Sequence, residues 1–102
     1  MDSITNRKFT IPEIKSIVVP IAETHGVAKV YLFGSYARGD ATETSDIDLW
    51  VERGEVKTLF ALGGFYADLE EGLGKSIDII TDDAMDEKFR NNIKSEEIVI
   101  YG

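Results

Sequence analysis

The sequence predicts a small α/β or α+β domain, and three observations support this fold class. The chain has 102 residues, which is enough for a single domain over residues 1–102 and too few for two. Hydrophobic residues make up 43% of the chain, an ordinary share for a packed protein. Runs rich in β-branched and aromatic residues alternate with stretches of helical spacing, as expected of strands and helices packed in layers.

The first predicted element is a helix that follows Thr10 and stops at Gly26. Thr10 and Glu13 have the spacing of a capping box, and apolar side chains then recur every three or four residues. Pro20 lies inside this stretch. Because proline lacks a backbone N–H and clashes with the preceding turn, we expect it to kink or restart the helix.

The rest of the chain alternates between predicted strands and helices. Composition predicts strands at residues 28–33, 46–52, 76–81 and 98–101. Apolar spacing predicts helices that begin near Ser35, extend from about Val56 to Gly74, and span residues 82–97. The closing strand could be an inner strand or an exposed edge that binds a partner, and we expect it to be buried.

Charge and composition exclude several classes of function. The formal net charge is −8, from 19 acidic against 11 basic residues, which argues against binding a long nucleic acid through a basic face. A single nucleotide is still allowed, because a metal ion can supply the compensating charge. The absence of cysteine excludes disulfides and thiolate zinc sites. No apolar run approaches the roughly 20 residues that span a bilayer, so we expect a soluble cytoplasmic protein that binds no membrane.

Three aspartates are the candidate metal-binding residues. Side chains alternate faces along a strand, so Asp46 and Asp48 share one face, and Asp78 points away from its apolar neighbours in the next strand. If the strands are neighbours, the three carboxylates lie on one patch, where like charges are unfavourable without cations. Carboxylate oxygens suit Mg²⁺, and a two-metal site is the functional interpretation. A solvated strand face, or charges that protect a sheet edge, is the alternative.

Gly34 and Ser35 are the candidate phosphate-binding residues. They lie between a strand and the start of a short helix, where free backbone N–H groups can bind an anion. Glycine lets the backbone approach a ligand closely, and the serine hydroxyl can donate to a phosphate oxygen. The alternative is an ordinary turn with a helix cap. Arg38 could contact a phosphate or a partner, or form a surface salt bridge.

These residues carry a family resemblance. The stretch GSYARGDATETSDIDLWV, with Asp78 on a later strand, resembles the signature of the polymerase-beta-type nucleotidyltransferases: Gly-Ser, a spacer, then Asp-x-Asp. Arg38–Gly39 within the spacer, Ser45 before the first aspartate, the length and the closing NNIKSEEIVIYG are similar to the minimal nucleotidyltransferases of prokaryotes. The resemblance covers residues 10–102.

The resemblance implies a fold, a reaction and a set of site residues. The fold would be α+β, an α/β sandwich with a mixed sheet and helices packed on one side. The reaction would transfer a nucleoside monophosphate from an NTP, with ATP as the expected substrate, and would use Mg²⁺ and release pyrophosphate. Asp46, Asp48 and Asp78 match the catalytic and metal-binding carboxylates, and the third favours deprotonation of the acceptor hydroxyl. The nucleotide-binding positions would be Gly34, Ser35, Arg38 and Ser45.

The resemblance also implies a partner. Minimal nucleotidyltransferases are commonly the antitoxins of type VII toxin–antitoxin pairs, whose toxins are HEPN-type ribonucleases, and some adenylylate a tyrosine of the toxin. We therefore expect transfer of AMP to a toxin hydroxyl within a hetero-oligomer. A non-catalytic antitoxin that neutralises the toxin by contact is one alternative. Transfer to a small molecule such as an aminoglycoside is another, but it usually needs an added acceptor-binding domain.

One departure from the family pattern concerns the spacer. Many relatives carry a second basic residue before the Ser-Asp pair, whereas this chain has Asp40–Thr44 at that place. The sequence therefore predicts a less positive phosphate end than the family usually has.

Overall fold

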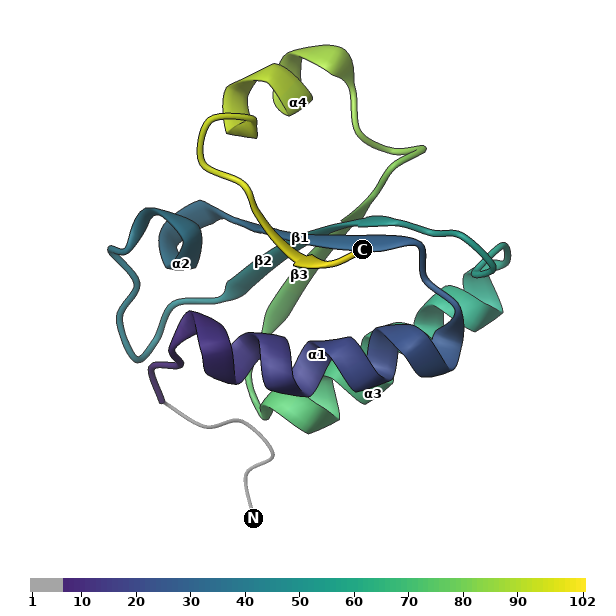
Figure 1. The fold of residues 1–102 in the computed structure, drawn as a ribbon, viewed down its shortest axis with the longest axis horizontal. Helices are drawn as coiled ribbons and strands as arrows, with labels where there is room; N and C mark the ends of the chain where they lie inside the picture. Colours follow the sequence, from purple (N-terminus) through teal and green to yellow (C-terminus); the bar gives the residue numbers. More distant parts are fainter. Residues whose placement is uncertain (1–6) are drawn as a thin grey trace.

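The computed structural model describes residues 7–102, so residues 1–6 of the predicted domain lie outside the described part. These residues form four helices and four strands (Figure 1). In chain order, the elements are α1 (Ile11–His25), β1 (Lys29–Phe33), α2 (Gly34–Arg38), β2 (Ile47–Glu52), α3 (Leu59–Leu73), β3 (Ile77–Thr81), α4 (Glu87–Ile93) and β4 (Ile98–Tyr101).

The four strands form one mixed sheet in the order β3-β2-β1-β4. β1 runs antiparallel to both β2 and β4, whereas β2 and β3 are parallel. A parallel pair needs a crossover connection, and α3 supplies it. The mixed sheet and the α+β class that the resemblance implied are confirmed.

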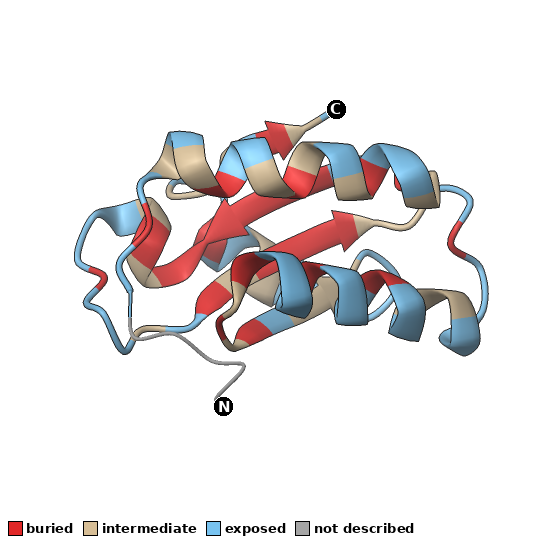
Figure 2. Cartoon of the chain, turned by 90° about the horizontal axis from the view of Figure 1, so that it is seen from below, coloured by how far each residue is buried: buried red, intermediate tan, exposed pale blue. Residues whose placement is uncertain are grey.

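The two faces of the sheet bury different sets of side chains. α1 and α3 pack together on one face, and Figure 2, viewed from their side, shows buried residues concentrated on the strands behind them. Their shared core includes Ile14, Val18, Leu32, Leu49, Phe65 and Leu69. The shorter α4 lies over the opposite face, where Ile93 packs with Tyr31, Phe33 and Trp50 (Figure 1). The two long helices are thus on one side, as the resemblance implied, and α4 adds a smaller layer on the other.

α1 begins and ends as predicted but is not restarted by Pro20. The Thr10 hydroxyl accepts from the Glu13 amide at 3.2 Å, the Glu13 carboxylate accepts from the Thr10 amide at 2.9 Å, and Gly26 caps the end with a φ of 77°. One helix continues from Ile11 to His25 across the proline. Pro20 is exposed, so the carbonyl that loses its helical donor lies on the solvent side, where water can bind it.

The predicted helix over residues 82–97 is wrong at both ends, because α4 spans only Glu87–Ile93. Asp82 and Asp83 form a turn and pair with Arg53 at the end of β2, at 3.8 and 3.2 Å. The helix starts after Asp86, whose carboxylate accepts from the Phe89 amide at 2.7 Å. Aspartate at this position satisfies a free N–H of the first turn, which fixes the start of the helix.

α3 also begins later than predicted. Thr58 caps it, with its hydroxyl accepting from the Ala61 amide at 3.0 Å, so the helix starts at Leu59. Val56 lies in the preceding loop and is 2% exposed, which means that it fills the core without being helical.

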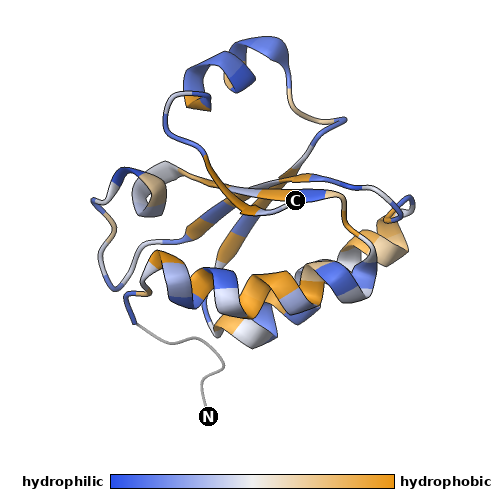
Figure 3. Cartoon of the chain, in the orientation of Figure 1, coloured by the Kyte–Doolittle hydropathy of each residue, from blue (hydrophilic) through white to orange (hydrophobic). Residues whose placement is uncertain are grey.

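β4 is an edge strand of the sheet, with β1 as its neighbour. The expectation of burial holds for Ile100, which is 1% exposed, whereas Val99 is 49% exposed. α4 is largely hydrophilic, while apolar residues follow the strands (Figure 3). Across residues 7–102, none of the helices has the length and apolar character needed to cross a membrane.

Candidate active site

The strand register brings the candidate carboxylates to one end of the sheet. Asp48 of β2 pairs with Asp78 of the parallel strand β3 on one side and with Phe33 of β1 on the other. Asp46 directly precedes β2. Alternation along β2 places Asp48 on the same face as Trp50, which is the face that α4 covers. The register therefore places Asp48 and Asp78 side by side on this face, and Asp46 lies two residues before Asp48.

Gly34, in the candidate phosphate-binding turn, lies directly against Asp48, one of the candidate metal-binding residues. It has a φ of 75°, and a Cβ built on it would overlap a carboxylate oxygen of Asp48 and lie 3.0 Å from the Asp48 Cγ. Neither the backbone angle nor the space allows a side chain here. Two segments that are separated in the sequence by the spacer are thus in van der Waals contact at one point.

The charges of the site are coupled. Burial, followed by the charge of Asp78 and a hydrogen bond to its side chain, raises the pKa of Asp48 to about 6 from an ordinary value of 3.8. The charge of Asp46 acts in the same direction, and the Arg38 guanidinium opposes it. Burial and the charges of Glu70, Asp78 and Asp46 likewise raise the pKa of Tyr66, whose hydroxyl donates to the Ile77 carbonyl at 3.2 Å. The three aspartates therefore lie within electrostatic reach of one another.

The aspartates fit a metal site by their chemistry, although their side chains do not converge in this arrangement. Within residues 7–102, no three His, Cys, Asp or Glu side chains lie close enough together to hold a metal ion. Asp48 and Asp78 approach each other as a pair, and their carboxylates repel when both are ionised. Burial is the largest cause of the raised pKa of Asp48, and the charges of Asp78 and Asp46 add to it. A hard divalent cation with oxygen ligands would offset the repulsion among these carboxylates.

The candidate phosphate-binding turn has two hydrogen-bond donors, the Gly34 amide and the Arg38 guanidinium, and both contact the Glu96 carboxylate. The Gly34 amide donates to the Glu96 Oε1 at 3.1 Å, and the Arg38 Nη1 lies 3.5 Å from the same oxygen. Arg38 also donates to the Asp40 carboxylate at 3.3 Å, and this contact raises the arginine pKa above its ordinary value. The Gly34–Arg38 turn can thus bind an anion, and a side chain of the protein occupies it here.

A scan against family models matches residues 15–102 to the polymerase beta nucleotidyltransferase domain. The chain belongs to this family. It is a nucleotidyltransferase, and the match includes the glycine turn and all three aspartates.

Individual relatives cover most of this nucleotidyltransferase. A Methanocaldococcus jannaschii protein, provisionally named a protein adenylyltransferase (MJ0435), is 43% identical over 88% of this chain and 97% of its own. A solved structure described provisionally as a minimal nucleotidyltransferase superposes with a TM-score of 0.75 at 31% identity, over 88% of this chain and 95% of the other. The MNT antitoxin solved with a tri-AMPylated Shewanella oneidensis HEPN toxin has a TM-score of 0.69 at 16% identity, covering 91% and 73% of the two chains, and shares the fold.

The two candidate serines of the nucleotidyltransferase lie in different settings. The Ser45 hydroxyl accepts from the Thr42 amide at 2.9 Å, so it closes its own loop. The Ser35 carbonyl accepts from the amides of Gly39 and Asp40, both at 3.0 Å, which tightens the end of α2. Gly34, Arg38 and Asp48 are brought together, whereas the Ser45 hydroxyl is engaged within residues 42–45.

Sequence reasoning missed Lys75 and Glu96. Lys75 is 3% exposed, and its Nζ donates to the Glu43 carbonyl at 2.5 Å, so it ties the spacer loop to the start of β3. Glu96 reaches Gly34 across 62 positions of sequence. Glu96 lies in the closing stretch that resembles the family, but its contact with Gly34 follows only from the fold, as does the contact of Lys75.

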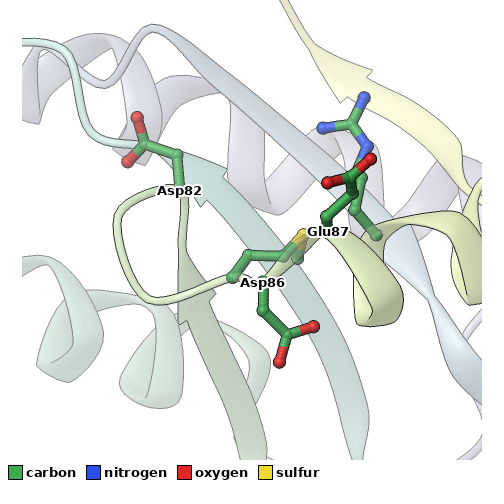
Figure 4. A pocket seen from close by; sticks show the side chains of 5 residues that line it. Asp82, Asp86 and Glu87 are labelled. Carbon is green, nitrogen blue, oxygen red and sulfur yellow. The ribbon is translucent and has the colours of Figure 1, made fainter.

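A shallow depression of about 270 Å³ lies beside α4, away from the three candidate aspartates. Its lining consists of Asp82, Met85, Asp86, Glu87 and Arg90. The carboxylates of Asp82, Asp86 and Glu87 point in different directions (Figure 4). This depression therefore does not offer converging ligands for a cation.

Proposed function

We propose that this nucleotidyltransferase transfers AMP from ATP to a hydroxyl of a partner protein. The acceptor is a tyrosine of a HEPN-type ribonuclease toxin, and the chain acts as the antitoxin of a type VII toxin–antitoxin pair. The observation that carries the proposal is the contact between Gly34 and Asp48, because it joins a phosphate-binding turn to a carboxylate pair. ATP supply makes the cytoplasm the proposed location.

Each residue of the site has a proposed role. The Gly34 amide, the Ser35 hydroxyl and the Arg38 guanidinium bind the triphosphate, and Ser45 shapes the loop that leads to Asp46. Asp46, Asp48 and Asp78 would hold Mg²⁺. Bound Mg²⁺ would neutralise the charge that develops on the phosphate oxygens and on the leaving pyrophosphate.

The proposed reaction is an in-line displacement at the α-phosphorus. The acceptor oxygen forms a bond to that phosphorus, the bond to the β-phosphate oxygen breaks, and pyrophosphate leaves with the electron pair. Asp78 takes the acceptor proton. The site contributes mainly by positioning the two reactants and by stabilising charge.

The known relatives support a protein acceptor. The Methanocaldococcus relative, at 43% identity, has protein adenylyltransferase in its name. The Shewanella MNT antitoxin, which shares the fold, was solved in a complex with an AMPylated HEPN toxin.

A non-catalytic antitoxin is the second candidate, and one observation favours it. The Gly34 amide is already bound to Glu96, so the turn is satisfied without a nucleotide. Against it, a vestigial site gains nothing from keeping Asp48 and Asp78 side by side, because their repulsion is unfavourable.

Incubation with α-labelled ATP, Mg²⁺ and the protein encoded beside this chain tests the proposal. We expect label on the partner, its loss on chelation of Mg²⁺, and a tyrosine as the modified residue in fragment mass spectra. Complete toxin neutralisation with no label on the partner would instead establish the non-catalytic antitoxin.

A further inference from the structure

Glu96 is held against the phosphate-binding turn by a short, well-anchored segment. The amides of Glu96 and Glu97 both donate to the Ile93 carbonyl at 3.0 Å, so the chain turns tightly after α4. The neighbouring Glu97 accepts from the Trp50 Nε1 at 2.8 Å and lies 3.6 Å from the Arg90 guanidinium. Glu97 therefore fixes the segment to the sheet, while Glu96 projects toward Gly34.

The Glu96 carboxylate has the chemistry of the ligand that the turn is proposed to bind. One of its oxygens accepts from the Gly34 amide and lies 3.5 Å from Arg38, and its side chain is 23% exposed. A backbone amide carries a single hydrogen, so one anion oxygen at a time can take its full hydrogen bond. A phosphate brought beside this carboxylate would also meet like-charge repulsion.

We propose that Glu96 is a built-in competitor of the nucleotide, which occupies the Gly34 amide and Arg38 until a triphosphate displaces it. This inference rests on the proposed function of the turn and adds a regulatory contact to it. The contact does not block the site permanently, because Glu96 is partly exposed and its side chain can rotate away without moving the anchored Glu97.

The expected effect on triphosphate affinity depends on the fraction of time that Glu96 is in contact with Gly34 and Arg38. A protein that is competent for only a fraction of the time binds with an apparent affinity reduced by that fraction. If the Glu96 contact is closed about nine-tenths of the time, its removal tightens triphosphate binding about tenfold. Adenosine has no phosphate to compete with Glu96, so removal of the Glu96 carboxylate should not change the affinity for adenosine.

Calorimetric titration of Mg²⁺-ATP into the wild type, Glu96→Gln and Glu71→Gln tests the inference. Both substitutions remove one negative charge and keep the side-chain shape, and Glu71 is exposed on α3, so Glu71→Gln controls for overall charge. Glu96→Ala adds a variant that cannot accept from Gly34 at all. We expect tighter binding by both Glu96 variants, wild-type binding within about twofold by Glu71→Gln, and a shift of the Gly34 amide resonance in Glu96→Gln before any nucleotide is added.

The outcomes separate this inference from the proposed function. Equal ATP affinity in the wild type and both Glu96 variants would overturn the inference and leave the nucleotidyltransferase proposal standing. Weaker binding by the Glu96 variants would also overturn it, because Glu96 would then assist the nucleotide. Failure of all four proteins to bind Mg²⁺-ATP would overturn the proposed function, and the inference with it.

Discussion

Gly34 and Gly39 both have positive φ angles, of 75° and 87°, but they differ in their surroundings. A Cβ on Gly34 would overlap the Asp48 carboxylate, whereas a Cβ on Gly39 would have no atom within 4 Å. Alanine at either position strains the backbone, at a cost of order 1–3 kcal/mol. The pair therefore separates the effect of strain from the effect of contact with the carboxylate.

We predict that Gly34→Ala abolishes nucleotide transfer, because it displaces Asp48, while Gly39→Ala keeps most of the activity. Gly39→Ala should lose stability of order 1–3 kcal/mol in chemical denaturation from backbone strain alone, and Gly34→Ala should lose at least as much, because it adds the overlap with Asp48. Comparable activity in the two variants would show that the Gly34–Asp48 contact is not needed for the reaction.

Asp48 makes stability depend on pH. Its pKa is about 6 in the folded protein against an ordinary 3.8, so the folded state binds this proton more tightly than the unfolded chain does. The contribution of Asp48 to stability is therefore complete below about pH 4 and is lost as pH rises through 6. At neutral pH, without metal, its ionised carboxylate is a net cost.

Asp48→Asn should therefore raise the melting temperature by a few degrees at pH 7 in a chelating buffer, and by much less at pH 4.5. Thermal unfolding of the wild type and the variant at both pH values measures this difference. A difference that is the same at both pH values would contradict the assigned cause, because it would not follow the charge of Asp48.

At the scale of single elements, the loop between α2 and β2 is held in place by a hydrogen bond to Lys75. Lys75 lies between α3 and β3 and donates to the Glu43 carbonyl, which ties the loop before β2 to the neighbouring strand. The amide of Ser45 donates to the Thr42 carbonyl at 3.1 Å within that loop. The loop leads directly to Asp46, so its anchor should act on the position of that carboxylate.

We predict that Lys75→Met speeds amide hydrogen exchange in residues 40–46 and lowers transfer activity, while exchange in α1 stays unchanged. Methionine keeps the apolar stem in its buried place and removes the donor, so a large loss of global stability is not expected. Lys57→Met, at an exposed lysine, is the control for charge. Unchanged exchange in the loop would rule out the proposed anchoring by Lys75.

Most elements were predictable because their signals are local. The capping box at Thr10 and the glycine stop at Gly26 depend on residues that are close in sequence, and they fix α1. The prediction of a helix over residues 82–97 was wrong at its start because the helical spacing competes with two contacts that are not local. These are the ion pairs of Asp82 and Asp83 with Arg53. The cap at Asp86 then decides where the helix can begin.

At the scale of the whole molecule, the sheet order determines what a motif can do. Alternation in the sequence places Asp46 and Asp48 on one face, but only the parallel pairing of β2 with β3 sets Asp78 beside Asp48. The same topology returns the chain from α4 to the edge strand β4 and so carries Glu96 to Gly34. The candidate site residues are therefore visible in the sequence, whereas the contact of Glu96 with Gly34 follows only from the fold.

The surface of the molecule limits where a partner can bind. Leu59 and Phe60 at the start of α3 are 86% and 94% exposed, and Val99 on the edge strand is 49% exposed. With a net charge of −8, the chain favours a basic protein partner over a nucleic acid.

The carboxylates of this chain are proposed to catalyse adenylyl transfer to the partner. The most direct test follows the intact mass of the partner and its ribonuclease activity together, after incubation with Mg²⁺-ATP and either the wild type or Asp46→Asn. We predict that the wild type adds the mass of an adenylyl group and silences the ribonuclease, whereas Asp46→Asn does neither. Silencing by Asp46→Asn with no change in the mass of the partner would contradict the account.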